Sequence, residues 1–122
     1  MEAAELRRLF EGAKATKYVN YEWIAEVCEH LRKLANGRVD DEVRVRVSEA
    51  PKKVREELDR RIELWAVRGV DDGELWPIYE RLIVLAELLA ERPDRLAVVN
   101  LCSKAKAIAF TVETARKVAS LK

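Results

Sequence analysis

Basic and aromatic side chains alternate in the stretch KATKYVNYEW, which contains Lys14, Lys17, Tyr18, Tyr21 and Trp23. Nucleobases stack on aromatic rings and phosphates are followed by Lys or Arg, so this combination is typical of proteins that bind single-stranded nucleic acid. The three aromatic residues lie where we expect a helix to begin, outside the main apolar stripes. Trp65 and Tyr79 lie near such stripes, and we expect them in the core. The five residues of the stretch therefore form the first part of a candidate binding surface.

A second basic group lies in EVRVRVSEAPKKVR and contains Arg44, Arg46, Lys52, Lys53 and Arg55. The alternation of valine and arginine over residues 42 to 49 predicts a β-strand, with Val43, Val45 and Val47 towards the core and the two arginines on the opposite face. Such arginines also occur as solvated charges that protect an edge strand from aggregation. The lysines that follow favour the interpretation as a phosphate-binding surface.

Catalytic and metal-binding patterns are weak in this chain. It has one histidine, His30, which we expect on the surface, and it contains no glycine-rich phosphate loop or Cys/His cluster with zinc-ligand spacing. The acidic pairs Asp40-Asp41 and Asp71-Asp72 lie where turns or helix N-termini use carboxylates. We therefore expect no enzyme activity, no cofactor and no metal.

The composition indicates one domain over residues 1–122, with a net charge of +1. Residues 56 to 93 carry five Lys/Arg against ten Asp/Glu, whereas residues 95 to 122 carry six against one, so one surface is expected to be acidic and another basic. Charged residues make up 37% of the chain and glutamine is absent, a pattern typical of hyperthermophiles that suggests a thermophilic archaeal or bacterial source. The chain has no signal-peptide pattern and no stretch long enough to cross a membrane, so we expect a cytoplasmic protein.

The two cysteines, Cys28 and Cys102, lie among apolar residues in helical patterns. This setting favours buried, reduced thiols, although a disulfide between them remains an alternative.

Helical periodicity predicts five helices. The first covers residues 3–14, and the second covers residues 21–35 with Asn20 as its N-cap and Asn36-Gly37 as its stop. The third begins with Pro51 in its first turn and ends at Arg68-Gly69. The fourth begins between Asp72 and Trp76, so that Pro77 falls in the first turn, and ends at Pro93. Asp94 caps a long fifth helix.

The fold class is therefore mainly α (α+β), with about five helices and one short β-strand after the second. A lone strand needs a partner for its backbone N–H and C=O groups. We expect it to pair with the same strand of a second subunit in a homo-oligomer, a dimer or tetramer. Pairing with KYVNY, or a short hairpin through Val39, are the alternatives within the chain.

The order of two N-terminal helices, a short Val/Arg strand and then charged and apolar helices resembles the N-terminal domain of the ThermoDBP-related single-stranded-DNA-binding proteins of hyperthermophilic archaea. KYVNYEW, EVRVRVSEAP and RRIELWAVRG carry the resemblance and cover about half of the chain. It implies single-stranded DNA held between the subunits of a homo-oligomer. It assigns no individual site residue, and the zipper-like tail of the larger members is absent from this sequence.

The leading hypothesis is a non-catalytic protein that holds single-stranded nucleic acid, DNA rather than RNA, in a basic, aromatic-lined groove. The sequence leaves open whether the strand or the basic last helix, with Lys104 and Lys106, lines that groove. The alternative is a small helical structural subunit of a larger complex, for instance a CRISPR effector complex, which would use the alanine-rich last helix for packing.

Overall fold

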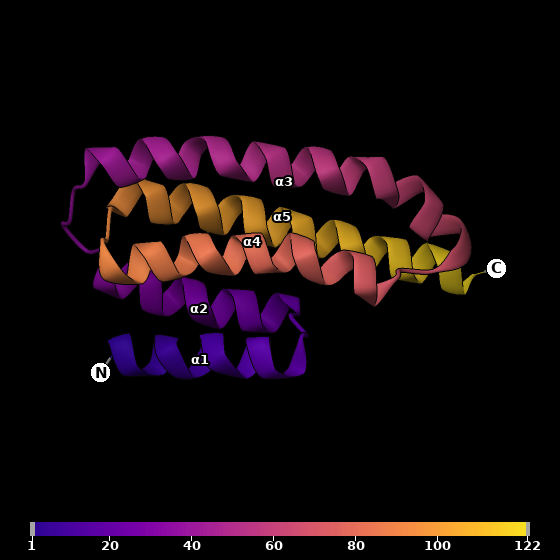
Figure 1. The fold of residues 1–122 in the computed structure, drawn as a ribbon, viewed down its shortest axis with the longest axis horizontal. Helices are drawn as coiled ribbons and strands as arrows, with labels where there is room; N and C mark the ends of the chain where they lie inside the picture. The colour runs from indigo at the N-terminus through magenta and orange to yellow at the C-terminus, as the bar shows by residue number, and fades with distance from the viewer. Residues whose placement is uncertain (1, 122) are drawn as a thin grey trace.

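The computed structural model describes residues 2–121, and these form five α-helices without a β-strand (Figure 1). The mainly helical class is confirmed, whereas the predicted strand is wrong. The helices are α1 (Glu2–Thr16), α2 (Tyr21–Leu34), α3 (Asp41–Arg68), α4 (Asp72–Glu91) and α5 (Arg95–Ser120).

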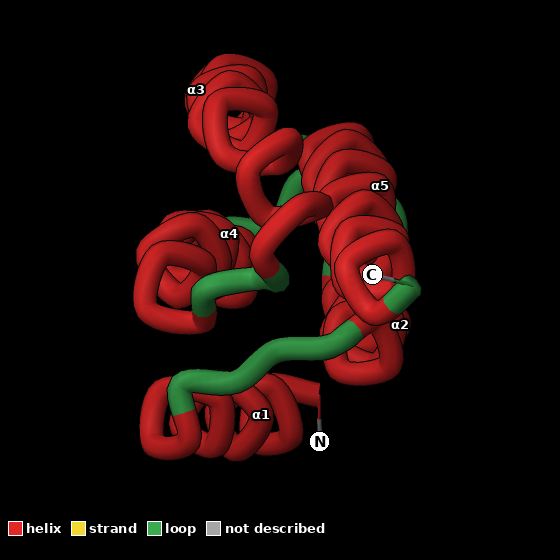
Figure 2. Tube along the Cα trace, turned by 90° about the vertical axis from the view of Figure 1, so that its right-hand side faces the viewer, coloured by secondary structure: helices red, strands yellow, loops and turns green. Residues whose placement is uncertain are grey.

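Three long helices, α3, α4 and α5, lie alongside one another, and the shorter α1 and α2 cover one half of their length (Figure 1). In the view along the helices, α5 and α2 lie on one side of the molecule, α4 and α1 lie on the other, and α3 lies at the top, where it packs against α5 and α4 (Figure 2). α5 therefore lies between α3 and α2, and it packs against both.

Four helices begin at a residue whose side chain accepts a hydrogen bond from the first turn. Asn20 Oδ1 accepts from the Trp23 N–H at 2.8 Å, and Asp94 Oδ2 accepts from the Ala97 N–H at 2.7 Å, as the sequence predicts. The caps of α3 and α4 are one residue of each acidic pair. These carboxylates therefore serve helix starts, as the sequence analysis expects.

Residues 42 to 49, predicted as a strand, form the beginning of α3. Val43 and Val47 are buried, but Val45 is 62% exposed, so the three valines do not share a face. The buried positions continue a helical stripe through Val54 and Leu58, with spacings of four and seven residues. The longer helical pattern of buried residues therefore decides the structure of this segment, and the local alternation of valine and arginine does not. Because residues 42 to 49 are helical, they present no strand edge that could pair with the same segment of a second subunit.

Both internal prolines lie deeper in their helices than expected. Pro51 is buried well inside α3 and not in a first turn, so the Val47 carbonyl lacks its usual helical donor. α4 begins at Asp72, the early limit of the predicted range, which places Pro77 in the second turn. The capped beginning of α3 holds the segment before Pro51 in helical form.

All five helices contribute side chains to one continuous apolar core. Trp65 is fully buried and donates its indole N–H to Glu74 Oε2 at 3.3 Å, and Tyr79 is also buried. The predicted core positions of both aromatic residues are therefore confirmed.

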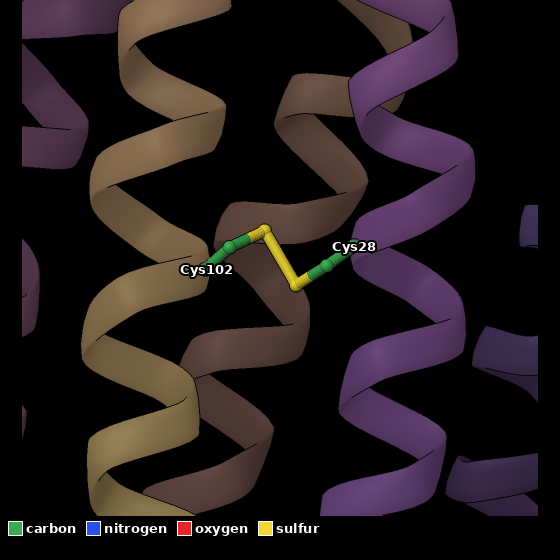
Figure 3. The surroundings of a disulfide bond; sticks show 2 residues. All are labelled: Cys28 and Cys102. Atoms are coloured by element: carbon green, nitrogen blue, oxygen red, sulfur yellow. A yellow bond between two sulfur atoms is a disulfide. The ribbon is translucent and has the colours of Figure 1, made fainter.

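Cys28 of α2 and Cys102 of α5 are joined by a disulfide (Figure 3). The favoured prediction of reduced thiols is wrong, and the alternative holds. The apolar stripes of the two helices face each other, which brings the two Cα atoms to 5.9 Å, within the range that a disulfide spans.

Candidate nucleic-acid interface

The beginnings of α3 and α5 are joined to each other, and this fixes how the two helices lie side by side. The Asp40 N–H donates to Asp94 Oδ1 at 2.8 Å, and the Arg95 N–H donates to the Arg38 carbonyl at 3.0 Å. Both helices run in the same direction from this point (Figure 1). A basic segment of α3 is therefore brought beside the basic middle of α5.

A groove of about 380 Å³ lies between the two helices, and we call it the α3–α5 groove. Lys52 and Arg55 of α3 and Lys104 of α5 line it, with one acidic residue, Glu56. The remaining lining residues are apolar: Pro51, Ala107 and Ile108. The groove thus combines an apolar surface with three cationic side chains and one carboxylate.

The three cations differ in how far they are engaged. Arg55 donates to Thr111 Oγ1 at 3.2 Å and pairs with Asp59 at 3.1 Å, so its guanidinium is held in place. Lys52 and Lys104 are exposed, and within residues 2–121 neither has a carboxylate at salt-bridge distance. These two ammonium groups are available to an anionic ligand.

Arg44, which we predicted on the binding surface, is engaged by carboxylates of the chain itself. It donates through Nε and Nη2 to the buried Asp94, at 3.2 and 2.9 Å, and its Nη1 lies 3.4 Å from Asp41. These donors lower the pKa of Asp94 to about 2, mainly through the Arg44 hydrogen bonds and against the effect of burial. Arg44 is therefore a structural partner of the helix junction.

The other predicted basic residues are dispersed. Lys14 pairs with Glu87 of α4 at 2.7 Å. Arg46 and Lys53 are exposed. They precede Glu57 by eleven and four residues, spacings that place all three side chains on the same side of α3. On that side Glu57 contacts Arg81 of α4. Only Lys52 and Arg55 of the predicted set meet in the α3–α5 groove.

The predicted stacking residues lie at the turn between α1 and α2. Trp23 donates its indole N–H to the Leu9 carbonyl at 3.1 Å, and its ring lies 6.3 Å from that of Phe10, so it is largely a packing residue. Tyr18 is 59% exposed and lines a hollow of about 350 Å³ together with Trp23. Tyr21 is exposed at the beginning of α2.

Lys17, in the same turn, has a left-handed backbone with φ of 54°. The residues lining the hollow are different from those of the α3–α5 groove. The predicted site thus divides into separate regions.

Phe110 is an aromatic residue that the sequence analysis did not select. It is 67% exposed on α5, three residues after Ala107 of the α3–α5 groove and four residues after Lys106, so it lies on the outer surface of α5 beside the groove and not in its lining. Its position outside the buried stripe of α5 was the available signal. Together with the groove it gives α5 both cationic and aromatic groups.

His30 is partly buried and its Nδ1 contacts Glu2, which lowers the pKa of that carboxyl. The prediction that His30 is a surface residue is therefore correct only in part. Within residues 2–121, no group of three or more His, Cys, Asp or Glu side chains is placed to hold a metal ion.

No family model matches the chain, and no curated protein or solved structure matches it. Among residues 2–121, no helix is both long and apolar enough to span a membrane.

Proposed function

We propose that this chain binds single-stranded nucleic acid without catalysis and that the phosphate backbone follows the α3–α5 groove. The observation that supports this proposal most is the meeting of Lys52, Arg55 and Lys104 from two helices, with the two lysines free of carboxylate partners among residues 2–121. Lys17, Lys33, Lys53, Lys106 and Lys117 also have no carboxylate at salt-bridge distance among residues 2–121, but the α3–α5 groove brings two such lysines from different helices together. An ammonium group without a local partner gains most from a phosphate.

A single strand suits this surface better than a duplex. The groove is small and has an apolar floor, and the adjoining Phe110 offers an exposed ring on which a base can stack, a contact worth roughly 1–3 kcal/mol. Single-stranded bases are free to reach such a ring, whereas bases in a duplex are stacked on one another. DNA is favoured over RNA only by the family resemblance.

The resemblance to the ThermoDBP-related proteins stays part of this proposal. The two N-terminal helices agree with the expected order, but the Val/Arg segment that suggested a strand belongs to α3. A cytoplasmic location in a hyperthermophile belongs to the proposal too, because disulfides persist inside such cells and ion-pair networks are frequent in their proteins.

A fluorescence titration with a labelled oligo-dT at two salt concentrations tests the function. We expect binding at low salt that weakens steeply as salt rises. Replacing both free lysines, Lys52→Ala with Lys104→Ala, should lower the affinity roughly tenfold and reduce the salt slope by about 1.4, since each phosphate contact on a single strand contributes about 0.7.

The matched control is the pair Arg46→Ala with Lys53→Ala, which removes the same charge from the other side of α3. This pair should affect affinity much less, because non-local attraction is screened within about 10 Å at 0.1 M salt. Equal losses in the two double variants, or no binding of the unaltered chain at low salt, would contradict the proposal.

A structural subunit of a larger assembly is the second candidate. Leu96, Val99 and Phe110 are exposed on the outer side of α5, where small residues between them permit close approach of another helix. Mass measurement in solution and the oligo-dT titration separate the two functions. A monomer without affinity for nucleic acid would favour the structural subunit.

A further inference from the structure

The disulfide between α2 and α5 lies at the bottom of a second open groove, on the opposite side of α5 from the α3–α5 groove. Cys28 is 8% exposed and Cys102 is 9% exposed, and both line a hollow of about 300 Å³, which we call the α2–α5 groove. The bond bridges the two helices directly (Figure 3). A small molecule in the groove therefore lies against both cysteines.

Each cysteine has a cationic residue one helical turn after it in the same groove. Arg32 follows Cys28 by four residues, and Lys106 follows Cys102 by four residues. Glu29 also lines the groove and pairs with Arg32 at 2.5 Å, so it offsets one of the two charges. Lys106 has no carboxylate at salt-bridge distance within residues 2–121. The groove consequently keeps a net positive charge beside the disulfide.

We propose that the α2–α5 groove is a thiol–disulfide exchange site at which a small anionic thiol reduces the Cys28–Cys102 bond. A positive charge attracts an anionic thiolate and also stabilises the cysteine thiolate that leaves. An enclosed structural disulfide would lack both the opening and the charge.

The exchange proceeds in two steps. The thiolate of the first small thiol attacks one protein sulfur, the S–S bond breaks, and the other cysteine leaves as a thiolate that takes up a proton. A second small thiolate then attacks the mixed disulfide and releases the second protein cysteine. Two small thiols are oxidised to one disulfide, and the protein disulfide is reduced to two thiols with the same two electrons.

Reduction removes the covalent link between α5 and the α1–α2 part of the chain. α1 and α2 are then held by side-chain packing, by the Lys14–Glu87 ion pair and by the chain connection through residues 35–40, so the state of the disulfide changes how firmly they are attached. This inference is independent of the proposed nucleic-acid binding.

The test compares thiols of different charge on the oxidised chain of residues 1–122 at neutral pH. The probes are 3-mercaptopropionate, 2-mercaptoethanol and cysteamine, and rates of mixed-disulfide and dithiol formation are followed by alkylation and mass spectrometry. Each rate is divided by the rate of the same probe with a neutral small-molecule disulfide, which removes differences in thiolate fraction and in intrinsic nucleophilicity between the probes. On this scale we expect mercaptopropionate to react roughly threefold faster than mercaptoethanol, and cysteamine to be the slowest.

Lys106→Gln should reduce this preference for the anionic thiol, and Lys106→Arg should retain it. Lys117→Gln is the matched control, because it removes the same charge from α5 at an exposed position that does not line the groove. Equal rates for the three probes after normalisation to the neutral reference disulfide would overturn the proposal. So would reduction that accelerates with denaturant in parallel with global unfolding, or a chain that carries free thiols after air oxidation.

Discussion

Asp94 is the only charged residue among residues 2–121 that is fully buried. Its carboxylate accepts hydrogen bonds from Arg44, from the Asp40 N–H and from the Ala97 N–H, so it caps α5 and also holds the beginning of α3. Removing such a group takes away a helix cap and leaves Arg44 without its main partner. A single side chain thus joins the beginnings of the two longest helices.

We expect Asp94→Ala to lower the free energy of unfolding by roughly 2–4 kcal/mol. Urea unfolding followed by circular dichroism measures this loss. Arg46→Ala is the control, since Arg46 is exposed and should change stability by less than about 0.5 kcal/mol. A loss in Asp94→Ala no larger than in the control would show that the junction is not stabilising.

The same carboxylate predicts a pH dependence of stability. Its pKa is about 2 in the folded chain, below the ordinary value of 3.8, so its contribution is fully present above pH 3.8 and is lost as the pH falls through 3.8 towards 2. The stability difference between the unaltered chain and Asp94→Asn should therefore be constant near neutrality and shrink in that acidic window. A stability difference that stayed constant down to pH 2 would contradict the lowered pKa of Asp94.

At the scale of elements, α3 is the segment where local sequence and structure differ most. Helix starts at Asn20 and Asp94 were predictable because a cap residue and the following apolar stripe lie close together in the sequence. The strand prediction failed at Val45, because alternation over six residues coincides with a four-residue helical spacing between Val43 and Val47. The buried stripe that continues to Leu58 was the signal for a helix across Pro51.

Alanine replacements at two valines distinguish a helix from a strand over residues 42 to 49. In α3, Val47→Ala should lower the free energy of unfolding by roughly 1–3 kcal/mol, because Val47 is fully buried. Val45→Ala should change it by less than about 0.5 kcal/mol, because its side chain lies in solvent. A strand would place both valines on one face, so equal losses at the two positions in thermal or urea unfolding would contradict the helix.

The candidate site was less predictable than the helices, because it depends on how one helix packs against another. Lys52 and Lys104 are far apart in the sequence, and the junction at Asp40, Asp94 and Arg95, together with the apolar packing of α3 on α5, brings the two helices into the observed register. Residue types identified both lysines as basic candidates. Their convergence depends on tertiary packing, which local patterns do not encode.

At the scale of the whole molecule, the disulfide joins two parts of the chain that are 74 residues apart in sequence. A cross-link over such a distance restricts the unfolded chain and is expected to add about 4 kcal/mol to stability. Reduction, or the double variant Cys28→Ala with Cys102→Ala, should lower the thermal midpoint accordingly. An unchanged midpoint in scanning calorimetry would mean that the bond is absent or that strain cancels its effect.

The α3–α5 groove carries the central claim about function, and amide chemical shifts of the ¹⁵N-labelled chain titrated with oligo-dT test it most directly. The predicted result is that the largest shifts cluster around Lys52 and Arg55 in α3 and around Lys104 to Phe110 in α5. Shifts confined to the turn around Tyr18, or no shifts at low salt, would contradict it.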